Sequence, residues 1–455
     1  MTDQFSLALP EATKQKLTIG WLWLGLSSLI IAGIFSILLV LSRVPQAQHF
    51  IPWLDFFHTS IVIHVDMSVL IWFLSYGCLV WTVTTKRLNG PIGWTALGLA
   101  SIGTFIIGAS PFLGAGDPLM NNYVPVLRHP LFFSGLILFG AGITLLVISG
   151  LKPDNFNTTG NESVLRIGAY SALLITAIAI ISLLWAWLEI PRDTEDHAYF
   201  EYLFWGSGHT VQFAYTQLML VSWLWLYASL GKQIVFSNKI IAAVLIIGAL
   251  PVLLTPVIHG IYGSFSIEYR QHFTTLMRLG GGIAALPIGL LVFIGLMNQN
   301  TQLGNDQKPI NNALIASILL FGAGGALGFM THGVNTIIPA HYHGSIVGVT
   351  LAFMGLTYYL LPRLGYSAPV SKMARRQPYI YASGQFIHIS ALAIGGAMGI
   401  QRKTAGAAQG LDSFAAKAVM GIMGLGGLIA IIGGIIFLVV TIRCMMNRPN
   451  QVTGH

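Results

Sequence analysis

Two histidines separated by one residue stand at the start of a long apolar segment. They are His341 and His343, in the run Pro-Ala-His-Tyr-His-Gly over residues 339–344. On an α-helix, side chains two residues apart point about 200° away from each other. That arrangement suits two flat cofactors, one on each side of the helix, better than a single metal ion. The alternative is a pair of histidines that face water at a membrane interface.

Three further histidines lie in other apolar segments of the chain: His64, His209 and His259. When the chain is divided into the membrane spans given below, these three histidines lie at a depth similar to that of His341 and His343, in the outer third of the membrane. Neutral imidazole is the usual ligand for haem iron, copper and non-haem iron. Five histidines from four helices at one depth therefore indicate buried metal cofactors. The alternative is that these histidines are unrelated and lie near the outer membrane interface because polar side chains are tolerated there.

The segments that carry these histidines are membrane helices. The chain has 455 residues, of which 55% are hydrophobic and only 8% are charged, whereas soluble proteins have about 25% charged residues. This composition predicts an all-α, polytopic membrane protein, and the basic balance does not indicate nucleic acid. Twelve stretches approach the roughly 20 residues that a crossing needs. They are residues 19–43, 57–84, 92–114, 130–151, 165–189, 203–230, 238–262, 273–298, 311–332, 339–362, 378–400 and 416–443.

Basic residues predict the orientation of these spans, because they concentrate on the cytoplasmic side. Most of the 23 lysines and arginines fall on the side of the two termini: Lys14, Lys16, Lys86, Arg87, Lys152, Arg166, Lys232, Lys239, Lys308, Arg363, Lys372, Arg375, Arg376, Arg443 and Arg448. Both termini are therefore expected in the cytoplasm. We expect a single transmembrane domain over residues 1–455, with short cytoplasmic tails at 1–18 and 444–455.

Three stretches resemble the catalytic subunit, subunit I, of the haem–copper oxidase superfamily. The most specific is AHYHGSIVGVTLAFMGLTYYLLP at 340–362, which is similar to the tenth helix of the family. The others are VIHVDMSVLIWF at 62–73, similar to the second helix, and WGSGHTVQF at 205–213, similar to the sixth. The resemblance covers essentially the whole chain and implies a single bundle of twelve helices.

The resemblance implies a role for each histidine. His341 would be the proximal ligand of a high-spin haem, and His343 and His64 would be the two ligands of a low-spin haem. His209 and His259 would bind a distal metal, copper or non-haem iron, opposite the high-spin haem. The family further implies a respiratory oxidoreductase of the bacterial inner membrane. Electrons would come from cytochrome c or quinol through a partner like subunit II, and O2 would be the acceptor.

The chain departs from the family pattern beside the distal metal. The family usually places two adjacent histidines on the seventh helix, and here Ile258 precedes His259. The distal site would then have two histidine ligands instead of three. Gln212, Tyr262 or another chain could supply a third, or the metal could be bound weakly or be absent.

Residues that oxygen reductases use for electrons and protons are also replaced. Phe213 and Leu253 occupy the two positions where the family places a tyrosine near the distal metal. Val211 stands where a glutamate usually follows the sixth-helix histidine. Asp66 and Glu201 are the nearest remaining candidates for carrying protons inside the membrane, and a solvated or packing role for each is the alternative.

Four functions therefore stay open. The first is a terminal oxidase that reduces O2, and the second is a nitric oxide reductase of the same superfamily. The third is a haem-binding membrane subunit without catalysis. The fourth is a twelve-helix transporter, although such carriers tend to show repeated halves and broken helices at the midplane, and the two halves of this chain show no convincing similarity.

Overall fold

A computed structural model of the chain describes residues 5, 7, 12–41, 55–85, 90–114, 116–152, 162–298, 302–331, 335–402 and 413–447. Contacts within the chain divide it into two compact units. The N-terminal unit comprises Leu7–Val221 and Phe236–Ile288. The C-terminal unit comprises Met1–Ser6, Ser222–Val235 and Gly289–His455. Each unit is described by itself below.

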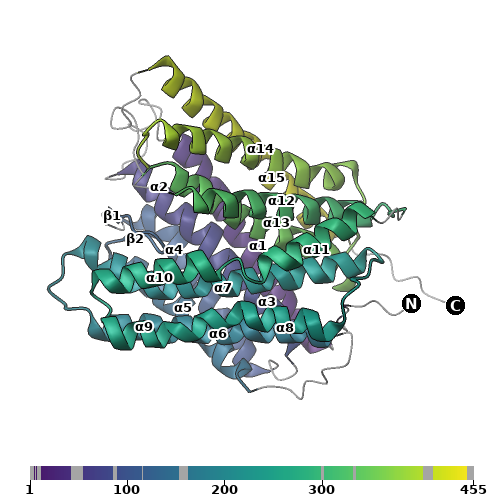
Figure 1. Cartoon of the computed structure of the whole chain (residues 1–455), viewed down its shortest axis with the longest axis horizontal. Coiled ribbons are helices and arrows are strands. Elements are labelled where there is room, and N and C mark those ends of the chain that lie inside the picture. Colours follow the sequence, from purple (N-terminus) through teal and green to yellow (C-terminus); the bar gives the residue numbers. More distant parts are fainter. Residues whose placement is uncertain are drawn as a thin grey trace. The chain divides into compact units, whose positions relative to one another are not determined.

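The N-terminal unit is helical, and its helices follow the predicted spans closely (Figure 1). In chain order its elements are α1 (Ala12–Leu41), α2 (Phe56–Val65), η2 (Asp66–Ile71), α3 (Trp72–Thr84), α4 (Pro91–Ala109), η3 (Ser110–Leu113), β1 (Pro118–Leu119), β2 (Val126–Leu127), α5 (Pro130–Gly150), α6 (Ser163–Glu189), α7 (Asp196–Ser229), α8 (Asn238–Ala249), η4 (Leu250–Leu254), α9 (Thr255–Tyr262) and α10 (Ile267–Gly280). The boundary between the units falls inside α7, between Val221 and Ser222.

The C-terminal unit contains four long helices besides the last part of α7 and most of α11 (Ala285–Asn298). They are α12 (Gln307–Phe329), α13 (Ile337–Arg363), α14 (Lys372–Ala397) and α15 (Phe414–Met446). Helices α12 and α13 run side by side, as do α14 and α15 (Figure 1).

Ten helical segments among the described residues are long and apolar enough to cross a membrane. They correspond to all of the predicted spans except the sixth and the eleventh. Those two fall on α7 and α14, which have 34 and 26 residues but carry more polar side chains. The polytopic, helical class is confirmed, and the count of twelve crossings stays a prediction.

Several predicted spans are not continuous α-helices, and prolines and glycines explain some of the interruptions. The seventh span contains α8, the 3₁₀ segment η4 and α9, and Pro251 lies in η4. Proline has no N–H for the helical ladder, so it disrupts a regular helix. Gly263 ends α9 with φ 66°, a conformation that side chains with a Cβ rarely adopt.

Two features of the fold were not predicted. The second span is not a regular α-helix, because the six residues of η2 form a π-helix directly after His64 and Val65. The all-α class is confirmed, and the one small addition is a pair of two-residue strands, β1 and β2, which pair antiparallel with Pro118 opposite Leu127. Helix α1 begins at Ala12, inside the predicted tail at 1–18. Residues 448–455 of the other predicted tail lie outside the described residues.

Glycines allow α12 and α13 to approach each other closely. A Cβ added at Gly344 of α13 would lie 2.6 Å from Cα of Gly324 on α12. A Cβ at Gly348 would lie 2.6 Å from Cβ of Phe321. Small residues are enriched where membrane helices pack backbone to backbone, since lipid offers no hydrophobic drive for their association. This contact places the first turns of α13, with His341 and His343, against α12.

We therefore expect Gly324→Val to destabilise the protein, by about 1–3 kcal/mol as for other overpacked sites. Gly322→Val is the matched control, because it lies on the same helix and a Cβ there meets no atom within 4 Å. Thermal unfolding of the two purified variants in one detergent measures the difference. Equal midpoints would contradict the packing role of Gly324.

Candidate functional site

In the C-terminal unit, His341 and His343 lie in the first two turns of α13. Nδ1 of His341 is 2.7 Å from the carbonyl oxygen of Gly324, and Nδ1 of His343 is 2.8 Å from that of Pro339. A carbonyl oxygen only accepts, so each Nδ1 carries the hydrogen and each Nε2 carries the lone pair. Metal-binding histidines have this arrangement, in which the second nitrogen donates to a carbonyl or carboxylate. In each neutral ring the lone pair therefore lies on Nε2, the nitrogen through which such a histidine would bind a metal.

His388 on α14 is a neighbour of the site that the sequence did not single out. Its ring centroid lies 5.0 Å from that of His343, and its Nδ1 is 2.9 Å from the carbonyl oxygen of Met423 on α15. Tyr342 stacks on His343 with a centroid distance of 4.9 Å. The ring of His343 is therefore held by contacts with two other rings. Hydropathy alone does not reveal this, since a single histidine in an apolar helix is usually a packing residue.

In the N-terminal unit, His64 occupies the ninth position of α2, and its Nδ1 is 3.0 Å from the carbonyl oxygen of Ala32 on α1. The lone pair again lies on Nε2. Asp66 follows at the start of the π-helical segment and is fully buried. Neither of its carboxylate oxygens has a hydrogen-bond partner among the described residues. Short π-helical segments are frequent at functional sites.

His209 lies in α7, where its Nδ1 is 2.8 Å from the carbonyl oxygen of Trp205 one turn earlier. The hydroxyl of Tyr123 is also 2.8 Å from this nitrogen. Tyr123 comes from the turn between β1 and β2, outside the membrane-spanning segments. Burial, and then the charge of Glu201, raise the pKa of the Tyr123 hydroxyl well above its usual value. This hydroxyl therefore stays neutral.

The close approach of Tyr123 depends on Gly208, which directly precedes His209 in α7. A Cβ added at Gly208 would overlap the ring of Tyr123. The turn itself is held by Asn122, whose backbone N–H donates to Oε2 of Glu201 over 3.1 Å and whose side chain donates to Oε1. Arg270 lies 3.7 Å from the same carboxylate. Glu201, a predicted proton carrier, is thus bonded to Asn122 and paired with Arg270.

His259, near the end of α9, has a different environment from the other four histidines. Its Nε2 is 2.7 Å from Oγ of Ser182, and its Nδ1 is 2.8 Å from Oγ of Ser264. Ser264 Oγ in turn lies 2.6 Å from Oε2 of Glu189. Both ring nitrogens are therefore engaged by hydroxyl groups, and neither meets a carbonyl oxygen.

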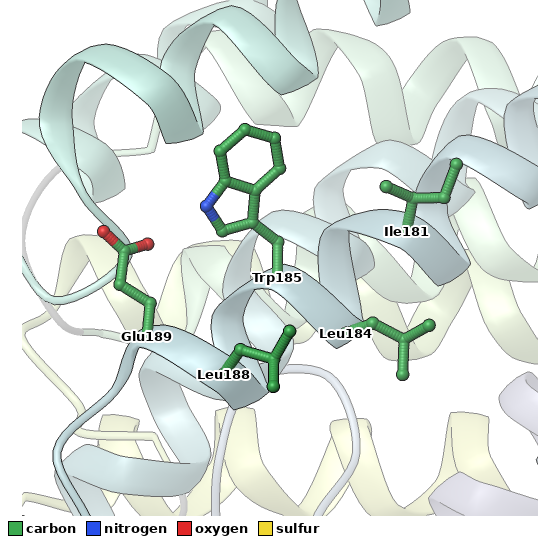
Figure 2. Close-up of a pocket in the computed structure, with 5 residues that line it drawn as sticks. All are labelled: Ile181, Leu184, Trp185, Leu188 and Glu189. Carbon is green, nitrogen blue, oxygen red and sulfur yellow. The ribbon is translucent and has the colours of Figure 1, made fainter.

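Glu189 closes one end of an open apolar pocket on α6. Ile181, Leu184, Trp185 and Leu188 form its other walls, and Trp185 and Glu189 project to the same side of the helix (Figure 2). The indole of Trp185 also stacks on His259, with ring centroids 5.2 Å apart and an interplanar angle of 25°.

The distal metal predicted at His209 and His259 does not fit the residues present. Both rings contact Phe273, with centroid distances of 6.2 and 5.6 Å. However, the part of the chain that the structure describes contains no group of three His, Cys, Asp or Glu side chains able to hold a metal ion. Tyr262, a possible third ligand, stacks on His272 with centroids 4.0 Å apart. Gln212 is half-buried in α7, and Ile258 is a buried apolar residue.

The two positions of the family tyrosine hold no polar group. Phe213 is buried, and Leu253 is 58% exposed on the surface of its unit. The tyrosine hydroxyl that does reach His209 belongs to Tyr123, which lies 86 positions earlier in the chain. No local motif marks this contact, so sequence reasoning missed it.

Comparisons with known proteins agree on the class of fold. The family model described as "Cytochrome C and Quinol oxidase polypeptide I" matches residues 16–447. An uncharacterized protein of Rickettsia prowazekii (strain Madrid E) is 28% identical, over 93% of this chain and 95% of that protein. An uncharacterized protein of Aquifex aeolicus (strain VF5) is also 28% identical, over 79% of this chain and 88% of that protein. A cryo-EM structure of a heme-copper terminal oxidase dimer matches with a TM-score of 0.74 at 19% identity, covering 98% of this chain and 86% of that chain.

We expect the contact between Gly208 and Tyr123 to appear as a coupling in stability. Gly208→Ala should lower the free energy of unfolding by about 1–3 kcal/mol, because the new methyl group overlaps the tyrosine ring. In a Tyr123→Ala background the same change should cost much less, since the ring is gone. Unfolding of the two single variants and the double variant measures the coupling. Gly98→Ala, where a Cβ meets nothing within 4 Å, is the control, and additive effects would contradict the contact.

Proposed function

Because the chain belongs to the cytochrome c and quinol oxidase subunit I family, we propose that it is the haem-binding subunit of a respiratory membrane oxidoreductase. Electrons from cytochrome c or quinol would enter through a partner subunit, and a small oxidant, O2, would be the acceptor. The oxidoreductase class and the oxidase fold follow from the family and from the structural match. The acceptor, the donor and the site residues are our proposal.

One observation supports this proposal most strongly. His64, His341 and His343 each direct Nδ1–H to a backbone carbonyl, which places the lone pair of each neutral ring on Nε2. His341 would hold the high-spin haem, and His343 and His64 the low-spin haem. The pairing of His343 with His64 rests on the family motifs. When bound, the haems supply one-electron transfer and an open iron face for a small oxidant.

The protein residues would do the rest by holding and shielding these groups. Beyond His343, α13 continues as an almost fully buried stretch from Val347 to Leu361, which excludes water and lowers the local dielectric. We further propose twelve crossings with both termini in the cytoplasm of a bacterial inner membrane. The concentration of basic residues on that side supports this orientation.

A haem-binding subunit without catalysis is the second candidate. The engagement of both nitrogens of His259 by serine hydroxyls favours it, because a distal metal would need one of them. A nitric oxide reductase is less well supported. Such enzymes usually carry a glutamate near the distal iron, and none occurs at the matching positions around His209. Membership in the oxidase family disfavours a transporter.

The purified protein should show the reduced spectrum of a b- or a-type haem. We expect His343→Ala and His64→Ala each to abolish the low-spin signal, because each change removes one of the two imidazoles that would hold the low-spin haem. His58→Ala and His272→Ala are matched controls. His58 pairs with Asp55 at 2.6 Å, and His272 stacks on Tyr262. A correctly folded but colourless protein would exclude the proposed function.

His341→Ala should have a different effect, with the low-spin signal retained and carbon monoxide binding lost. The physical reason is that only the iron held by one imidazole keeps an open face. Carbon monoxide difference spectra measure this, and O2 consumption with a reduced quinol or cytochrome c as donor measures the reaction. Haem without O2 consumption in the wild-type protein would favour the second candidate.

A further inference from the structure

The hydrogen bonds around His259 determine the position of each proton. Ser264 has one hydroxyl proton, and its Oγ lies 2.6 Å from the Glu189 carboxylate, which accepts it. The backbone N–H of Ser264 donates to the same carboxylate oxygen over 2.9 Å. Ser264 Oγ must then accept from His259, so Nδ1 carries the hydrogen. The lone pair of the neutral ring lies on Nε2, where it accepts from the hydroxyl of Ser182.

The ring cannot readily turn away from this arrangement. His259 is 2% exposed, and Ser182 is 1% exposed. Trp185 stacks on the His259 ring. Tyr269 and Phe273 contact it edge-on, with centroid distances of 5.1 and 5.6 Å. Turning the ring would leave two buried nitrogens and two hydroxyl groups unpaired, which is costly in an apolar interior.

The side chains near His209 and His259 do not supply the further ligands that a metal ion would need. Copper and non-haem iron sites in proteins are usually built from at least three imidazole, thiolate or carboxylate donors. Ile258 cannot donate, and the described residues offer no third His, Cys, Asp or Glu side chain to join His209 and His259. The contrast with His209 is direct, because there a carbonyl oxygen fixes the tautomer and leaves the Nε2 lone pair for other partners.

From this geometry we infer that His259 is not a metal ligand and that this chain holds no distal metal between His209 and His259. His259 instead ties three elements together. It bonds α6 through Ser182 and the turn after α9 through Ser264, and Glu189 links that turn back to the end of α6. The inference rests on the proposed function only in assuming that the metal of this protein is haem iron.

Metal analysis of the purified full-length protein tests the inference. The protein is equilibrated with a copper salt and then with ferrous iron, and unbound metal is removed. Haem is measured as its pyridine complex, and total iron and copper by elemental mass spectrometry. We expect total iron to equal haem iron, and copper to be absent. The inference would be overturned if the wild-type protein bound stoichiometric copper or non-haem iron and the His209→Ala/His259→Ala variant did not. Metal that the variant still binds lies at another site, and that result agrees with the inference.

The same preparation separates the two proposals. Absence of haem refutes the proposed function, whereas extra metal bound through the two histidines refutes only the inference about His259. Each readout is independent of enzymatic activity.

A second measurement tests the bonding role directly. Ser182→Ala should lower the unfolding temperature, and the Ser182→Ala/His259→Ala variant should be no less stable than His259→Ala alone, because both changes remove one contact. Ser171→Ala on the same helix is the matched control, since its hydroxyl donates to the carbonyl oxygen of Gly168 within its own helix. Additive losses for Ser182 and His259 would contradict the bond.

Discussion

A buried imidazole needs a partner for its N–H, and the choice of partner decides which chemistry the ring can perform. In the hydrocarbon interior no water satisfies the donor, so the protein must do so. His64, His209, His341 and His343 all solve this with a backbone carbonyl as the acceptor for Nδ1–H. Since a carbonyl oxygen cannot donate, the tautomer is fixed and Nε2 keeps its lone pair. The proposed binding of haem iron depends on this constraint.

His209 and His343 use a carbonyl of their own helix one turn earlier. His64 and His341 instead use a carbonyl of a neighbouring helix, which requires the two backbones to come close. The carbonyl of Gly324 reaches His341 because the glycines of α12 and α13 bring the two backbones together. Even Gly328 matters here, since a Cβ at that position would lie 2.7 Å from Nδ1 of His341. In the N-terminal unit, Gly208 leaves room for the ring of Tyr123 beside His209. Helix packing and site chemistry are thus set by the same small residues.

His259 shows that residue type and depth do not by themselves define a ligand. Its partners are serine hydroxyls, which both donate and accept, so both of its nitrogens are engaged. The glutamate that orders this chain of hydrogen bonds, Glu189, lies at the edge of an open pocket. The haem side and the distal side of the predicted centre therefore differ in chemical character. A reaction at a single haem iron, or haem binding without catalysis, is more consistent with these residues than a centre with two metals.

The helical class, the approximate bounds of most helices and the family could be predicted from the sequence. These depend on local properties: apolar length, prolines and glycines that interrupt helices, and histidine motifs within single segments such as 339–344. The groups that surround each histidine depend instead on how the helices pack. Ser182 lies 77 positions before His259, and Tyr123 lies 86 positions before His209. Neither hydropathy nor helical periodicity encodes such pairs, because they arise from the way separate helices pack. The two motif residues His209 and His259 looked alike in the sequence, and their hydrogen-bond partners made them different.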